Sequence, residues 1–137
     1  ARQKLSDLKE LNKQQVELEH KIAKEVEYQE KTLQPELERL TQEVTQKTGN
    51  LEVARNELAN AELRLKELEE KPDASNEELK KARKEVQAKK REIESQEREL
   101  KKAEKRKADT ERSLAGSVEK RETLEENLER KKKETEE

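Results

Sequence analysis

The sequence contains no cysteine, methionine, tryptophan or phenylalanine, and Tyr28 is its single aromatic residue. Without cysteine the chain can form neither disulfides nor thiolate metal sites. Its cysteine content therefore does not indicate whether it works in an oxidising or a reducing compartment. No apolar run approaches the roughly 20 residues of a membrane span, and no secretory signal core is visible. The two glycines are far apart, which excludes a glycine-rich phosphate-binding loop.

Charged residues dominate the composition instead. Half of the 137 residues are charged and only 27% are hydrophobic, so an ordinary globular core cannot be built. Such chains are usually disordered, unless an apolar repeat of about 3.5 residues turns them into coiled coils. The 33 basic and 35 acidic residues nearly cancel, and the total therefore implies no polyelectrolyte partner.

That apolar repeat is present in both halves of the chain. In the first half it comprises Leu37, Leu40, Val44, Leu51, Ala54, Leu58, Ala61, Leu65 and Leu68. In the second half it comprises Leu79, Ala82, Val86, Ile93, Leu100, Ala103, Leu114, Leu124 and Leu128. Polar residues share this second seam: Lys89, Gln96, Lys107, Thr110, Ser117 and Arg121. Steps of three and four predict an all-α fold, a long coiled coil.

A short segment, 71–76, interrupts the repeat near its midpoint. Pro72 cannot donate a helical hydrogen bond, and Ser75 with Glu78 forms a capping box that restarts a helix. Pro72, Asp73, Ser75 and Glu78 are therefore the expected turn and cap residues. We expect a first helix over 1–71, a turn over 72–76 and a second helix over 77–137, which together form an antiparallel helical hairpin. The alternative is a parallel dimeric coiled coil that is locally disrupted at this segment.

The hairpin predicts which residues face each other. A turn centred between residues 73 and 74 pairs residues whose numbers add to 147, such as Ala54 with Ile93, Leu33 with Leu114 and Ala23 with Leu124. Large residues repeatedly face small ones, as interdigitating layers require. Flanking pairs are mixed: Arg64 with Glu85 and Glu43 with Arg106 attract, whereas Arg55 with Lys90 and Glu57 with Glu92 repel.

The first 36 residues do not keep a single register. Leu8, Leu11, Leu18 and Ile22 follow one frame, whereas Val16, Ala23, Val26 and Leu33 follow the frame of the later residues. One skipped residue around 22–26 would reconcile the two frames. Pro35 suits the first turn of a helix and predicts a kink or break near 33–35.

No catalytic, cofactor-binding or metal-binding residues are expected. A two-helix rod offers no water-excluding site, and His20, the only histidine, is predicted to be exposed to solvent. The chain therefore predicts no enzyme, no cofactor and no small-molecule substrate.

One charged stretch stands out. Residues 79–107 contain 13 basic and 6 acidic residues. The basic residues expected on the outward face are Lys80, Lys81, Lys84, Arg91, Lys101, Lys102 and Lys105. This face could follow the phosphates of a nucleic acid without reading bases, and no aromatic residues interleave with it for stacking. The alternative interpretation, a solubilising face beside a more acidic first half, is favoured.

A long helix, a short Pro/Asp/Ser turn and a returning helix with matched heptads resemble part of the arms of SMC-family ATPases and their DNA-repair relatives. Repair-type arms would carry a Cys-x-x-Cys hook at the apex, and residues 71–76 contain none. In composition the chain is also similar to streptococcal surface coiled coils. The first resemblance implies an intracellular location and is preferred, and the second implies a cell surface. Because the chain begins with Ala1, we expect a piece of a longer protein.

Three functions follow as hypotheses. The first is a structural rod or spacer that sets the distance between other domains. The second is a binding surface for a protein partner or further helices, at the turn or along the polar seam over 89–121. The third is a DNA-contacting arm. The spacer with a helical interaction surface is the preferred interpretation.

Overall fold

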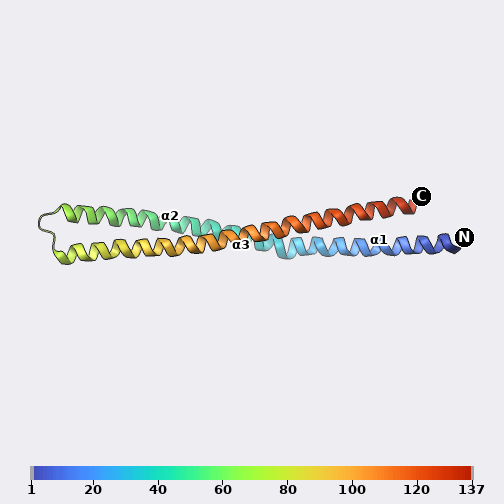
Figure 1. The fold of residues 1–137 in the computed structure, drawn as a ribbon, viewed down its shortest axis with the longest axis horizontal. Helices are drawn as coiled ribbons and strands as arrows, with labels where there is room; N and C mark the ends of the chain where they lie inside the picture. Colours follow the sequence, from blue (N-terminus) through green and yellow to red (C-terminus); the bar gives the residue numbers. More distant parts are fainter. Residues whose placement is uncertain (1, 137) are drawn as a thin grey trace. The chain divides into compact units, whose positions relative to one another are not determined.

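The computed structural model describes residues 2–136, and helices account for all of them except 71–75. The order is α1 (Arg2–Tyr28), the π-helix η1 (Gln29–Leu33), α2 (Gln34–Glu70) and α3 (Asn76–Glu136) (Figure 1). The described residues contain no strand, and the predicted all-α helical hairpin is confirmed. The helices flanking the turn end at Glu70 and begin at Asn76, one residue earlier than expected at each boundary.

The chain divides into two compact units. One, the turn unit, comprises residues 40–107. The other, the terminal unit, comprises residues 1–39 and 108–137. Each unit is an antiparallel pair of helices. One helix of each pair is a part of α3, which runs through both units.

The core of the turn unit lies along the predicted seam. Leu51, Ala54 and Ile93 form a buried cluster, against which Leu58 and Leu100 pack. Ala54 and Ile93 were predicted to share a layer, and both are buried. Every predicted seam position between 40 and 107 is buried or half-buried, the polar ones included. Alternating large and small residues therefore fill the narrow interface, as the sequence indicated.

In the terminal unit the register differs from the prediction. Val16 is 63% exposed and Ala23 is exposed, whereas Leu18 and Ile22 are half-buried. The frame that starts at Leu8 thus faces the partner helix, and the predicted layer of Ala23 with Leu124 is wrong. Half-buried residues before the π-helix match those of α3 when their numbers add to 146, not 147. Ile22 takes the place of Ala23 opposite Leu124.

The π-helix absorbs this one-residue shift. Its wider turn is closed by the Gln34 N–H, which donates to the carbonyl of Gln29 five residues earlier. A π-turn inserts one residue relative to an α-helix, which brings Gln29 and Leu33 onto the same buried seam. Pro35 explains the position, because its missing N–H and its ring disturb the preceding α-helical turn. The skipped residue therefore lies at 29–33 instead of the expected 22–26, and α2 continues through Pro35.

Cross-helix ion pairs flank the seam of the turn unit. Arg64 pairs with Glu85 at 3.0 Å and Arg106 with Glu43 at 3.6 Å, as the hairpin register predicted. The two expected repulsions are relieved by other partners. Arg55 extends to Glu97 at 3.3 Å, and Glu57 accepts from Lys89 at 2.7 Å. A long side chain can reach several neighbours, so its ion-pair partner is not always the residue at the facing position.

Candidate functional site

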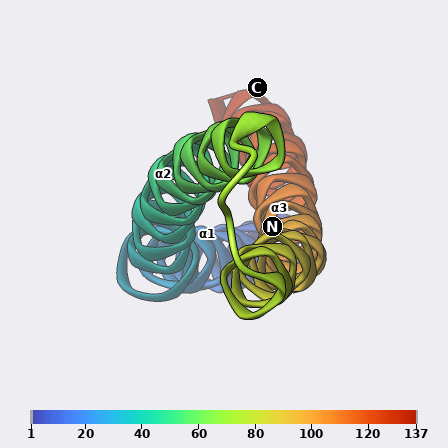
Figure 2. The same ribbon diagram turned by 90° about the vertical axis from the view of Figure 1, so that its left-hand side faces the viewer.

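The turn between α2 and α3 is built from the residues that the sequence singled out (Figure 2). The Lys71 N–H donates to the Leu68 carbonyl at 3.2 Å and closes α2. The Ala74 N–H donates to the Lys71 carbonyl at 3.5 Å, which places Pro72 second in a four-residue turn. Proline is favoured there because its fixed φ matches the turn. No residue among 2–136 has positive φ, so the reversal requires no glycine.

Ser75 caps α3. Its Oγ accepts a hydrogen bond from the Glu78 N–H at 3.1 Å, and its carbonyl accepts from the Leu79 N–H at 3.1 Å. Glu77 and Glu78 place negative charge in the first turn, where the helix dipole favours it. The loop between the helices is thereby fixed by hydrogen bonds at both of its ends.

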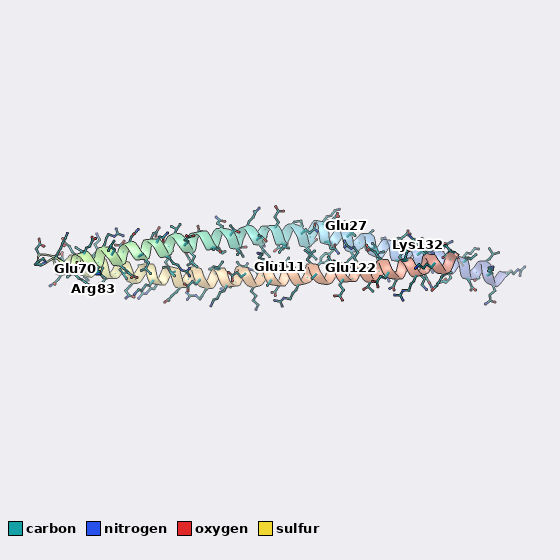
Figure 3. All side chains as sticks on the ribbon, turned by 90° about the horizontal axis from the view of Figure 1, so that it is seen from above. Glu27, Glu70, Arg83, Glu111, Glu122 and Lys132 are labelled. Carbon is teal, nitrogen blue, oxygen red and sulfur yellow. The ribbon has the colours of Figure 1, made fainter. Side chains whose placement is uncertain are left out.

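The outward face of α3 in the turn unit is basic. All seven residues of the candidate phosphate-contacting face are exposed: Lys80, Lys81, Lys84, Arg91, Lys101, Lys102 and Lys105. Lys102 lies 3.5 Å from Glu99. Within residues 2–136 the other six form no ion pair. The face lies on a single helix, and Lys80, Lys84 and Arg91 line an open hollow on it together with Arg83, which is labelled in Figure 3.

The opposite outward face, on α2, is nearly uncharged, a feature that the sequence reasoning missed. At the positions pointing away from α3 between 42 and 63, Glu52 is the single charged residue. Val53 and Leu63 lie on this face, and each is 56% exposed. In a chain of which half is charged, such a stretch is unusual. Reading the outward heptad positions alone, and not the seam, would have revealed it.

Lys89, a polar residue of the seam, finds a partner at the edge of the seam, whereas the Oε1 of Gln96 in the same seam is buried without a hydrogen-bond partner. The Nζ of Lys89 donates to Glu57 at 2.7 Å and lies 3.8 Å from Glu92, while the side chain is 28% exposed. The hydrogen bond that Lys89 donates to Glu57 raises the pKa of Lys89 above its usual value, and desolvation, the second-largest influence, acts in the opposite direction. The lysine stem thus covers apolar surface while the ammonium group reaches a carboxylate.

A buried polar layer lies beside the π-helix in the terminal unit. Gln29 and Ser117 are buried at 3% and 5% exposure. Ser117 Oγ donates to the Glu25 carboxylate, and Lys120 pairs with the same carboxylate at 3.4 Å. Arg121 donates to the Gln29 Oε1 at 3.2 Å. The sequence reasoning placed Ser117 and Arg121 in the seam but missed Glu25 and Gln29, because the register before Leu33 was open.

Hollows on the two units are open to solvent. A hollow in the terminal unit has a volume of about 460 Å³ and is lined by side chains of both charges, among them Glu17, Lys21 and Arg130. The described part of the chain holds no group of three or more potential metal ligands, and His20 is exposed. None of the helices over residues 2–136 is long and apolar enough to cross a membrane.

Comparison of the chain with protein-family models, with curated proteins and with solved structures found no match. The function must therefore be inferred from the two outward faces, the turn and the seam.

Proposed function

We propose that the chain is a structural spacer, a two-helix coiled coil that holds other parts of a longer protein at a set distance and offers a helical surface to protein partners. The arms of SMC-family ATPases are built on this plan, and the proposal assigns the chain an arm-like role of that kind. The observation that carries it is α3, a single helix of 61 residues that serves both units.

The packing supports this role. A lone helix of charged residues gains little from its own hydrogen bonds, and most helical stability in proteins comes from packing of one apolar face. Here the seam of α3 is covered along the turn unit by α2 and along the terminal unit by α1. Ion pairs within α3 add to the stiffness, such as Arg112 with Asp109 at 3.3 Å. A spacer needs this combination of length and lateral support.

Distance measurements between spin labels test the proposal. Lys84 and Glu126 are exposed on α3, one in each unit, so each can be replaced by cysteine in a chain that has none. A spacer gives one narrow distance distribution that stays unchanged between low and high salt. A broad distribution would contradict a distance-setting role. A second pair within the turn unit, at Lys84 and Lys105, provides the control for label flexibility.

Nucleic-acid binding is the second candidate function, and the exposed basic face, of which only Lys102 forms an ion pair, favours it. Exposed outward residues Lys84, Arg91 and Lys105 recur along α3 at multiples of seven residues, which aligns them along one line of the helix. Such a line can neutralise successive phosphates without sequence preference. The remaining residues of the face flank this line on either side.

Fluorescence anisotropy with a labelled DNA duplex at several salt concentrations tests this second function. Binding through phosphates alone should weaken steeply with salt, and Lys84→Glu with Arg91→Glu should abolish it at moderate salt. The matched control is Lys132→Glu with Lys133→Glu, which makes the same change in charge at exposed positions elsewhere on α3. No binding at low salt would remove the candidate function.

A further inference from the structure

A second heptad stripe runs along the outer side of α2. Val53, Asn56, Asn60 and Leu63, here called the outer stripe, are all exposed. They are spaced by three, four and three residues, the repeat of a coiled-coil seam. The seam of α2 that packs against α3 lies on the other side of the helix, at Leu51, Ala54, Leu58 and Ala61. One helix therefore carries two seams, of which α3 covers only one.

The outer stripe matches itself when reversed. In an antiparallel pair related by a two-fold axis, residues whose numbers add to 116 face each other. Val53 then faces Leu63 of the second copy, so that each exposed apolar side chain is covered by another. Asn56 faces Asn60 of the second copy, and two amides can exchange donor and acceptor. This reversal symmetry is the property that an isologous interface requires.

The charges beside the stripe agree with the same arrangement. Glu52 and Lys66 are exposed on one edge of the stripe, and the two-fold axis brings Glu52 next to Lys66 of the second copy, twice. Ala59 meets its own equivalent between these two pairs. On the other edge, Glu57 of one copy lies near Glu57 of the second copy. Because Glu57 already accepts a hydrogen bond from Lys89 at 2.7 Å, the repulsion between the two carboxylates is partly neutralised. Pairing through the outward face of α3 would instead bring basic residues together.

We propose that the outer stripe of α2 binds the same stripe of a second copy of this chain, antiparallel about a two-fold axis near residue 58. The inference does not depend on the spacer role. At about 1.5 Å per residue the stripe is roughly 15 Å long, well below the size of a standard interface. The dimer is therefore weak, with a dissociation constant on the order of 0.1 mM.

Sedimentation velocity over a dilution series reaching about 1 mM measures this dimer, since a constant in that range leaves a detectable dimer fraction. Leu63→Glu should weaken dimerisation at least about tenfold, because it buries two unpaired carboxylates against valine. Val16→Glu is the matched control: Val16 is 63% exposed but lies outside the stripe, and its replacement should leave dimerisation unchanged. Circular dichroism checks that both variants remain helical.

A charge exchange separates self-pairing from capture of an unrelated helix. Glu52→Lys alone should weaken the dimer about two- to tenfold, and Glu52→Lys combined with Lys66→Glu should restore it. Cysteines test the direction: a mixture of Val53→Cys and Leu63→Cys chains should form the mixed disulfide faster than either forms its own. A wild type that is monomeric throughout the series, no rescue by the double exchange, or preferred Val53→Cys self-linkage would each overturn the proposal.

Discussion

At the scale of single residues, a few polar side chains stabilise the hairpin through hydrogen bonds that the apolar seam does not provide. Ser75 satisfies a backbone N–H at the start of α3, and Lys89 fills a seam position while its ammonium group reaches Glu57. Both residues were visible in the sequence, Ser75 as part of a capping box and Lys89 as a polar intruder. The choice of Glu57 as the partner of Lys89 was not, because Glu57 was expected to repel Glu92.

Replacing Ser75 by alanine should lower the free energy of unfolding by about 1 kcal/mol, the usual loss for an N-cap side chain. The Glu78 N–H would then lack its 3.1 Å acceptor. Urea unfolding followed by circular dichroism measures the change. Ser95→Ala, at an exposed position inside α3, is the control and should be neutral or slightly stabilising. Equal effects of the two substitutions would contradict the capping role.

The contact of Lys89 with Glu57 should make the free energy of unfolding depend on pH in the alkaline range. Because Glu57 raises the pKa of Lys89 above 10.5, the stabilisation is complete below that pH and is lost as the pH rises through the higher folded-state pKa. The difference in urea midpoint between wild type and Lys89→Gln should stay constant from pH 7 to about 10 and narrow above it. Lys101→Gln, which removes one positive charge at an exposed position, is the control substitution. A difference that persists at the highest pH would argue against the Glu57 contact.

At the scale of elements, η1 determines how the first helix meets the last. The seam before it and the seam after it are out of phase by one residue, and the π-turn corrects the phase at Gln29–Leu33. The sequence revealed that a correction was needed and that Pro35 disturbs the helix. Its location followed from the pairing with α3, which holds Gln29 and Leu33 on one side.

Deleting Lys31 together with Pro35→Ala should convert η1 into regular α-helix and stabilise the chain by about 1–3 kcal/mol, since the extra residue and the proline are both removed. Lys31 is exposed, so no core contact is lost. Thermal unfolding by circular dichroism measures the gain.

The control for this change is a deletion of exposed Lys13 together with Pro35→Ala. That deletion does not change the number of residues between Ile22 and Leu33, and it shifts Leu8 and Leu11 off the seam, so it should lower the unfolding temperature. If both deletions gave the same result, the π-turn would not be the point at which the phase is corrected.

At the scale of the whole molecule, the short segment 71–75 decides whether the first helix packs against the second helix of the same chain or against another chain. Leu68 and Leu79 keep the same heptad spacing on either side of this segment, although the residues between them interrupt the apolar repeat, so an uninterrupted helix there would present one seam to a second chain. Pro72 and the hydrogen bonds of the turn remove that option in the structure. The partner helix is then supplied from the same chain.

Pro72→Ala with Asp73→Ala should therefore shift the chain towards a longer parallel dimer. Small-angle X-ray scattering should show an increase in maximum dimension together with a mass near twice 16.1 kDa. The Leu63→Glu background suppresses the proposed association of hairpins, and Glu70→Ala with Lys71→Ala is the matched control beside the turn. An unchanged particle length would count against the turn as the deciding feature.

The sequence by itself determined the helices, the seam after Leu37 and the reversal at Pro72, because heptad spacing, capping and proline geometry act over a few neighbouring residues. The tertiary structure decided the register of the first helix, the position of η1 and the choice of ion-pair partners. These depend on which residues of α3 lie opposite, and a one-residue shift changes local propensity hardly at all. The two outward faces belong to the sequence, since the outward heptad positions are defined once the seam is assigned.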